Sequence, residues 1–254
     1  MASSGNRLLG QHKGNVRGGR SFTGPVEFRQ GVSRCDYTEI FEEFLADAGA
    51  TLPTPWSTED TSAAGAPTLD YVTDTDNGTY ALITAANDEA EYLTLYWEDC
   101  LMVDATAGPI FEARLKINTD AATFSADQRM VIGLCGDRND TLDNVAAHAW
   151  FRVEGANLNI LWETDDGTTD DDDNDTTIDY VKNTYFRVLI DMTSLSQIEF
   201  WVDKEDGAGW QHGGTGAAAV MTGNLQPIVE QQKDGGTETD EVHIDYIRVA
   251  WERS

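Results

Sequence analysis

Apolar and polar residues alternate strictly from residue 111 to residue 117, which reads Phe-Glu-Ala-Arg-Leu-Lys-Ile. The apolar set is Phe111, Ala113, Leu115 and Ile117, and the polar set is Glu112, Arg114 and Lys116. Successive strand residues point to opposite faces of a sheet, so this period of two predicts a half-buried β-strand. Its apolar face must cover a core, and its charged face is expected to meet water or a groove. A second sheet is needed to complete that core.

Comparable strand patterns recur along most of the chain, and clusters of Gly, Asp, Asn or Pro bound most of them. They cover residues 79–84, 91–97, 111–117, 129–135, 148–153, 158–162, 185–191, 198–202 and 242–251. No comparably long helical period lies between them. Strands at this spacing predict an all-β fold, an antiparallel two-sheet sandwich of the jelly-roll type.

Four stretches lack a clear strand pattern. Residues 36–48 fit either a short helix, because the first of them have the spacing of a capping box, or a bent first strand. Residues 51–67 are rich in Pro, Thr, Ser and Ala and predict a loop. Residues 165–175 hold seven aspartates in eleven positions, and residues 205–216 are rich in glycine. We expect both of these to form loops at the ends of the sheets.

A chain of 254 residues can bury a large core as one main domain. Its formal charge is −28, from 17 basic and 45 acidic residues, so we expect the chain as a whole to be repelled by nucleic acid and by anionic membranes. The three cysteines form no CxxC pair, which favours buried free thiols over disulfides or a zinc site. The sequence shows no membrane-spanning run and no secretory signal, so we expect it to fold in the cytosol of the producing cell.

The charge is divided unevenly along the chain. Residues 1–34 contain six basic residues and one acid, a sum of +5, which leaves −33 for residues 35–254. Their glycine content and few large apolar residues predict an extended arm ahead of the jelly-roll domain. The arm is either a tail without a role or a segment that orders on a partner and ties copies into a trimer. The residues expected to contact a partner are Arg7, Leu8, Leu9, Lys13, Arg17, Arg20, Phe22, Phe28 and Arg29.

Three motifs carry a resemblance to a known superfamily. Residues 111–117 resemble the FEARxK strand of concanavalin A-like jelly rolls. Residues 242–249, Val-His-Ile-Asp-Tyr-Ile-Arg-Val, resemble the terminal xIDYxRV strand, and residues 199–203, Glu-Phe-Trp-Val-Asp, resemble a strand that leads into a VDG-type turn. The superfamily includes laminin-G-like lectin modules and the family 16 glucanases. The resemblance covers the chain from about residue 36 onwards and implies a concanavalin A-like fold.

A narrower resemblance links the chain to structural proteins of tailed bacteriophages that carry this fold. It is carried by residues 132–137, Ile-Gly-Leu-Cys-Gly-Asp, by residues 148–153, His-Ala-Trp-Phe-Arg-Val, and by residues 163–169, Glu-Thr-Asp-Asp-Gly-Thr-Thr. The resemblance implies a virion component such as a capsid decoration protein. Its partner would be the capsid shell protein, and its place would be the outer capsid surface after synthesis in the host cytoplasm.

The catalytic pair of the glucanases is missing. Retaining glycosidases need two carboxylates about 5 Å apart, which the family 16 enzymes supply as the glutamates of an ExDxE or ExDxxE signature. Here Glu163 with Asp165 and Glu238 with Asp240 begin such a signature, but neither has the second glutamate. No Gly-x-Ser-x-Gly elbow is present either. We therefore predict a protein that is not an enzyme and needs no cofactor.

Acidic and aromatic residues offer weak candidates for ligand contacts. The aspartate-rich segment supplies Asp171, Asp173 and Asp175, but the glycine of an EF-hand loop is absent, so a solvated acidic loop is favoured over a calcium site. A second triplet, Asp-x-Asp-x-Gly at 74–78, has a high false-positive rate. Most tryptophans fall within strand patterns and predict core packing. Trp210, in the glycine-rich segment beside His212, is the best candidate for a ligand contact.

Two functions fit these observations. The first is a structural protein fixed to a phage particle through its base and basic arm, which the strong acidity favours on an outer surface. The second is a carbohydrate-binding module of the same fold. The sequence favours the first and leaves the second open.

Overall fold

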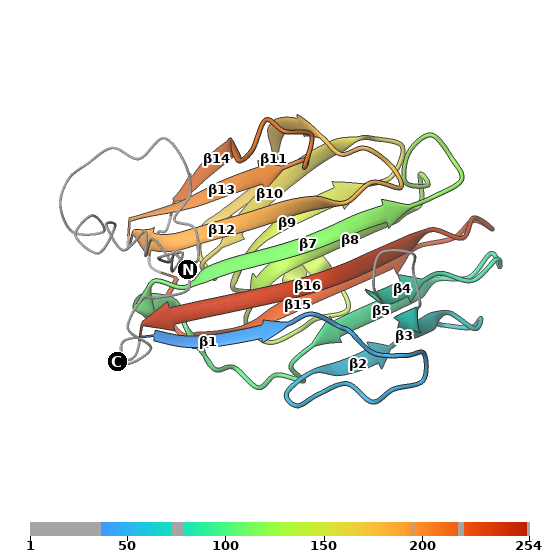
Figure 1. The fold of residues 1–254 in the computed structure, drawn as a ribbon, viewed down its shortest axis with the longest axis horizontal. Helices are drawn as coiled ribbons and strands as arrows, with labels where there is room; N and C mark the ends of the chain where they lie inside the picture. Colours follow the sequence, from blue (N-terminus) through green and yellow to red (C-terminus); the bar gives the residue numbers. More distant parts are fainter. Residues whose placement is uncertain (1–36, 73–78, 195, 218–220, 253–254) are drawn as a thin grey trace, which may run out of the picture.

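The computed structural model describes residues 37–72, 79–194, 196–217 and 221–252. They form two antiparallel sheets of eight strands each, packed face to face (Figure 1). Within these ranges the helical residues form two short 3-10 turns, η1 at Ala105–Ala107 and η2 at Leu142–Asn144. The all-β sandwich predicted from the alternating pattern is confirmed. No helix within these described ranges is long and apolar enough to cross a membrane.

The first sheet has the strand order β14-β13-β12-β7-β16-β4-β3, and β1 pairs with the second half of β16. Its strands are β1 (Tyr37–Glu42), β3 (Thr68–Val72), β4 (Thr79–Ile83), β7 (Ile110–Asn118), β12 (Phe186–Ser194), β13 (Gln197–Asp203), β14 (Gln211–Ala217) and β16 (Glu241–Glu252). Strands β7 and β16, which contain two of the three motifs that resemble concanavalin A-like jelly rolls, are neighbours near the centre of this sheet.

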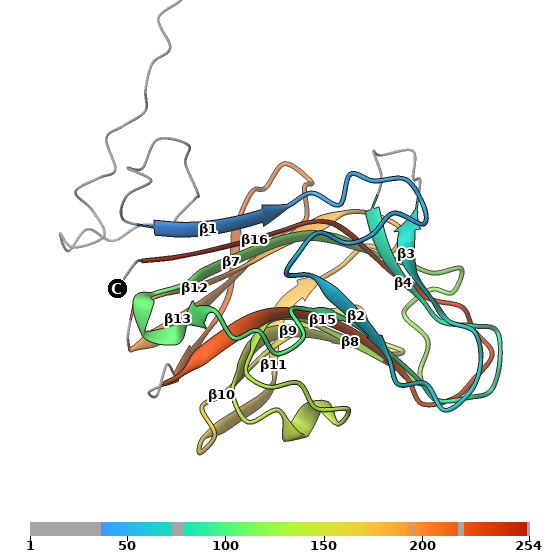
Figure 2. The ribbon, with the colours of Figure 1, turned by 90° about the horizontal axis from the view of Figure 1, so that it is seen from below.

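The second sheet has the order β11-β10-β9-β8-β15-β5-β2, and the short β6 also pairs with β15. Its strands are β2 (Ser57–Asp60), β5 (Glu91–Tyr96), β6 (Val103–Asp104), β8 (Gln128–Cys135), β9 (His148–Glu154), β10 (Asn159–Asp165), β11 (Asp170–Asp179) and β15 (Asn224–Lys233). Both sheets arch in the same direction (Figure 2), so we call the first the convex sheet and the second the concave sheet.

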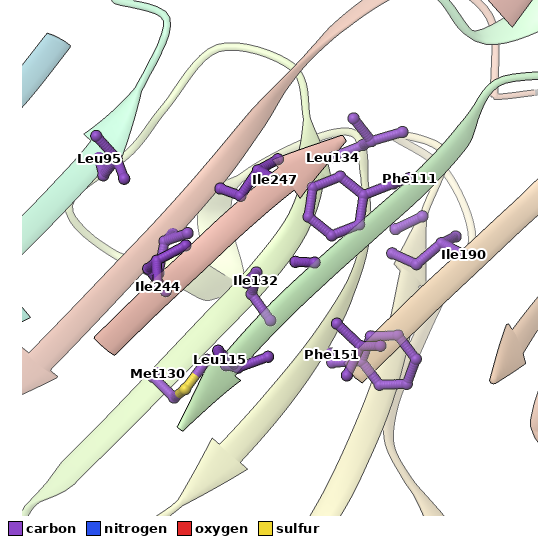
Figure 3. Close-up of a cluster of buried hydrophobic side chains, with 14 of the residues drawn as sticks. Leu95, Phe111, Leu115, Met130, Ile132, Leu134, Phe151, Ile190, Ile244 and Ile247 are labelled. Atoms are coloured by element: carbon purple, nitrogen blue, oxygen red, sulfur yellow. The ribbon is translucent and has the colours of Figure 1, made fainter. Parts of the chain in front are cut away.

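The core lies between the inner faces of the two sheets. Phe111 and Leu115 of the convex sheet face Ile132 and Phe151 of the concave sheet (Figure 3), and all four are at most 1% exposed. At about 25 cal/mol per Å² of buried apolar surface, this layer supplies most of the stabilising free energy. The predicted inner face of residues 111–117 is therefore confirmed.

The opposite face of β7 is not the wet surface that the sequence pattern suggested. Glu112 and Lys116 are only 8% and 9% exposed. The hydroxyl of Tyr246 donates to Glu112 at 2.6 Å, and the ammonium of Lys116 lies 4.9 Å from the centre of the Tyr185 ring. Side chains of β16 and around the start of β12 contact these charged groups. The alternation of charge therefore identified the outer face correctly, but it did not show that this face is fully solvated.

All nine predicted strand patterns coincide with strands, but several other expectations need correction. Of the two alternatives for residues 36–48, the structure shows a strand, β1 at Tyr37–Glu42, and no helix in the described part of this segment. Strand β2 lies within a segment that was expected to be a loop, and strands β11 and β14 begin within two others. In β14 the glycines are needed because a Cβ on Gly214 would come within 2.1 Å of the Trp162 ring nitrogen. Close packing of β14 on the concave sheet thus explains a composition that looks like a loop.

The cysteines agree only partly with the prediction of buried free thiols. Cys135 is buried and free, whereas Cys100 is free but exposed. Cys35 lies outside the described residues.

Candidate functional site

One row of side chains crosses four neighbouring strands on the outer face of the concave sheet. Strand register places Arg129 of β8 opposite Gln232 of β15, and Gln232 opposite Tyr92 of β5. Thr61, directly after β2, continues the row because its backbone N–H donates to the Tyr92 carbonyl at 3.1 Å. Residues at matched register on one face lie next to each other, so the four side chains form one surface.

Hydrogen bonds link this row to two aspartates in adjoining loops. Arg129 donates to both carboxylate oxygens of Asp234, at 2.8 and 3.2 Å, and also to Gln232 at 2.9 Å. Asp140 accepts from Thr61 at 3.0 Å through its carboxylate and from Gln232 at 2.7 Å through its carbonyl. We call the set Thr61, Tyr92, Arg129, Asp140, Gln232 and Asp234 the Tyr92 patch.

The Tyr92 patch is ordered, and its side chains are partly exposed except for that of Gln232, which is fully buried. The side chains of Arg129, Asp234 and Asp140 are 31%, 48% and 55% exposed. Burial and the nearby Asp234 carboxylate raise the pKa of Tyr92, so its hydroxyl stays neutral and donates to Asp234 at 3.4 Å. The patch therefore combines an aromatic ring with charged and amide groups whose positions are already fixed.

Beside the patch, the segment 136–147 covers the middle of the concave face. Its residues Leu142 and Val145 pack on Val131, Trp150 and Ile228 of the sheet. Arg138, on the same segment, lies 3.1 Å from the carboxylate of Glu230, and the two side chains are 6% and 0% exposed. Burial raises the pKa of Glu230, and the Arg138 guanidinium opposes that rise. This buried pair anchors the covering segment to the sheet.

A second buried carboxylate lies further across the same face. The indole nitrogen of Trp150 donates to Glu163 at 2.5 Å, and Arg152 lies 3.1 Å from Glu163. Arg152 also contacts Asp143 of the covering segment at 3.2 Å. Burial raises the pKa of Glu163 to about 7, although Arg152 and Trp150 act in the opposite direction. These contacts join strands β9 and β10 to the covering segment.

These two carboxylates do not form a glycosidase pair. Glu163 is on β10 and Glu230 is on β15, and strands β9 and β8 lie between them. Three strand spacings separate the two strands by roughly 14 Å. Retaining and inverting glycosidases need their carboxyl groups about 5–5.5 Å and about 6.5–9.5 Å apart. The geometry of this face thus agrees with the missing glutamate of the sequence signature.

We expect Glu163 to make the protein less stable as the pH rises from about 4.5 to about 7. The folded protein holds the Glu163 proton more tightly than the unfolded chain does, because its pKa is raised from 4.5 to about 7. The contribution of Glu163 to the free energy of unfolding is therefore fully present below the pKa of the unfolded chain. It is lost as the pH rises through the pKa of the folded protein, and the change is at most about 3 kcal/mol. Urea unfolding across this pH range measures it. In Glu163→Gln, stability should depend less on pH than in the exposed control Glu89→Gln. Equal pH dependence in the two variants would contradict the raised pKa of Glu163.

The predicted ligand residues Trp210 and His212 lie on the other side of the molecule, on the outer face of the convex sheet. Trp210 packs under the guanidinium of Arg187, 4.8 Å from the ring centre. The ring nitrogen Nε2 of His212 lies 2.5 Å from the carboxylate of Glu199, and its ring contacts Trp201 edge to face at 4.8 Å. The structure therefore places Trp210 beside an arginine and His212 beside a carboxylate, in two separate contacts. A ligand contact there stays a prediction.

The predicted metal candidates are distributed along strand β11. Asp171 accepts from Asn174 at 3.0 Å, and Asp175 accepts from Asn159 at 3.2 Å, so local amide groups already use their oxygens. Across the described ranges, no group of three or more His, Cys, Asp or Glu residues is placed to hold a metal ion. The aspartates at 74 and 76, like all of the arm residues named above, lie outside the described residues.

Sequence reasoning missed the Tyr92 patch. Its members come from β5, β8, β15 and three loops, and β15 was not among the predicted strands. The one local signal was the alternation of residues 91–97, which places Tyr92, Thr94 and Tyr96 on the face opposite Leu93 and Leu95.

Solved structures share this fold. The Emp47p carbohydrate recognition domain is 12% identical, with a TM-score of 0.55 over 88% of this chain and 100% of that domain. A protein of unknown function from Shewanella oneidensis MR-1 is 11% identical, with a TM-score of 0.56 over 85% of this chain and 87% of that one. The VIP36 exoplasmic/lumenal domain in its Ca²⁺/Man2-bound form is 9% identical, with a TM-score of 0.54 over 83% of this chain and 86% of that one.

These similarities define the fold of the chain, but they define neither its family nor its function. No protein-family model matches the sequence, and no curated protein matches it. Identities of 9% to 12% show a common fold alone. The chain has the concanavalin A-like jelly-roll fold that the strand motifs at 111–117 and 242–249 predicted.

Proposed function

We propose that this protein binds glycans through the Tyr92 patch on the concave sheet. One observation carries the proposal. A partly exposed aromatic ring lies in one row with a partly exposed arginine and a buried amide, and two carboxylates border that row. Hydrogen bonds hold these groups in place before any ligand arrives.

The chemistry of the patch suits a sugar ring. The apolar C–H face of a pyranose packs on an aromatic side chain, and its hydroxyl groups both donate and accept hydrogen bonds. Tyr92 offers the ring, Asp234 and Asp140 offer charged acceptors, and Arg129 offers charged donors. Hydrogen bonds with one charged partner are stronger than neutral ones. Groups that are already ordered lose little conformational entropy on binding.

The structural neighbours support this proposal over the virion role. One is named as a carbohydrate recognition domain, and another was solved with Ca²⁺ and Man2 bound. That another protein of this fold binds a glycan does not transfer its site to this chain.

A virion role is the second candidate, because the charge asymmetry between residues 1–34 and 35–254 remains unexplained by glycan binding. In that role the protein would decorate the outer surface of a phage capsid as an oligomer, held to the shell protein by its basic arm. The outer face of the convex sheet, with Trp210, Arg187 and Arg114, has the residue types that are enriched at protein interfaces. A glycan site and a surface location on a particle are compatible.

A glycan array probed with the labelled full-length protein tests the proposal. We expect binding to a restricted set of glycans, and we expect Tyr92→Ala to abolish the signal. Trp210→Ala, which removes an aromatic side chain from the opposite face, is the matched control and should bind normally. A blank array from a folded protein would contradict the proposal and favour the virion role. Loss of signal in Trp210→Ala alone would move the site to the convex sheet.

A further inference from the structure

The ammonium group of Lys233 is buried within a set of oxygen atoms. Its Nζ donates to the backbone carbonyls of Ala85 and Asn87 at 2.5 and 2.9 Å. The same ammonium lies 3.2 Å from the carboxylate of Glu91, and the side chains of both charged residues are 0% exposed. A buried ammonium is costly unless it is paired and hydrogen-bonded. All three contacts of Lys233 come from one short segment, residues 85–91.

This segment contains further oxygen atoms that have no partner. Glu91 uses one carboxylate oxygen to accept from the backbone N–H of Ala85 at 2.7 Å. Its other carboxylate oxygen and the side-chain oxygen of Asn87 are buried without a hydrogen-bond partner in the described part of the chain. Backbone carbonyls, a carboxylate and an amide oxygen are the ligands that hard cations take in proteins. Residues 85–91 therefore have the ligand types of a cation-binding loop, and the ammonium group of Lys233 takes the place of a metal ion. We call these residues the cation-binding loop.

The cation-binding loop is directly connected to the Tyr92 patch. Lys233 and Glu91 are cross-strand partners at the ends of β15 and β5, and the next residues are Asp234 and Tyr92. The loops that extend from these strands are also joined, because Asp88 accepts from the backbone N–H of Gly236 at 2.8 Å. A change in the position of the ammonium would therefore shift both the aromatic ring and the carboxylate of the patch.

We infer that Lys233 acts as a resident cation that positions the Tyr92 patch, so that the patch is assembled without a metal ion. The part of this inference that concerns the patch rests on the proposed glycan function. Lys233 is a positioning residue, since its contacts are with the loop 85–91 and the glycan would contact the groups on either side of it.

The test removes the ammonium and then returns it. Lys233→Ala leaves the Glu91 carboxylate buried without its partner, and we expect the melting temperature to fall by about 10 °C. Ethylammonium chloride should restore most of this loss, relative to sodium chloride at equal ionic strength, because the small cation refills the space. Lys233→Met should be destabilised without being restored, since its side chain fills that space. Lys182→Ala is the matched control, because Lys182 also donates to two backbone carbonyls but lies near the surface, and it should not respond.

Glycan binding gives the second measurement. The glycan array signal of the wild-type protein should be the same with EDTA and with millimolar calcium chloride. A signal that EDTA abolishes would overturn the inference while leaving the proposed glycan function intact. A Lys233→Ala protein whose melting temperature does not respond to ethylammonium would also overturn it. If ethylammonium restores the melting temperature of Lys233→Ala but the wild-type protein gives a blank array, the role of Lys233 as a resident cation would be supported and the glycan function rejected.

Discussion

Replacing Arg138 with methionine is expected to lower the free energy of unfolding by about 3–5 kcal/mol. The reason is that Glu230, whose side chain is fully buried, loses its charged partner while its desolvation cost remains. Arg138 also contacts Asp140 and Glu59, so the covering segment 136–147 loses its main attachment to the concave sheet. Urea unfolding measures the loss, and faster cleavage of the segment in limited proteolysis reports its release.

Arg129→Met provides the matched control on the same face. Its ion-pair partner Asp234 is half-exposed, and exposed pairs contribute about 0–1 kcal/mol. We therefore expect Arg138→Met to lose several kcal/mol more free energy of unfolding than Arg129→Met, although both residues lie on one sheet face. Equal losses would mean that burial does not set the strength of these pairs.

Replacing Leu115 with alanine is expected to cost about 2–5 kcal/mol, because the side chain is fully buried between the sheets and its removal leaves a cavity. The midpoint of urea unfolding should fall with little change in the slope of the transition. Leu45→Ala removes the same atoms from a position that is 60% exposed and should cost little. Similar losses in the two variants would contradict the assignment of β7 to the core.

Much of the sandwich could be predicted because each predicted strand has one face that must be apolar. The alternation of Phe111, Ala113, Leu115 and Ile117 fixes their direction whatever the rest of the chain does. Strand β15 was not predicted, because its sequence lacks a clear apolar face. Its sequence Glu-Gln-Gln-Lys at 230–233 looks solvated, but all four residues are buried, and the two charged ones are paired with Arg138 and Glu91. Such partners come from distant segments and leave no local pattern.

The candidate site was harder to predict than the fold. The Tyr92 patch is assembled by strand order, which places β8, β15 and β5 side by side although 103 residues separate Arg129 from Gln232. No spacing rule within the sequence detects such a set. Trp210 and His212 were found because they are close in sequence, but they lie on the convex sheet, where Trp210 contacts Arg187 and His212 contacts Trp201. The basic arm lies outside the described residues, and its partner role stays a prediction.

The most direct test of the central claim is a calorimetric titration of wild-type, Tyr92→Ala and Trp210→Ala proteins with the glycan that gives the strongest array signal. We predict saturable binding by the wild type, an unchanged Kd for Trp210→Ala, and a Kd at least about 10-fold weaker for Tyr92→Ala, which corresponds to about 1.4 kcal/mol of lost ring contact. All three proteins should melt at similar temperatures, since Tyr92 and Trp210 are only partly buried. Equal binding by the wild type and Tyr92→Ala would contradict a glycan site on the concave sheet.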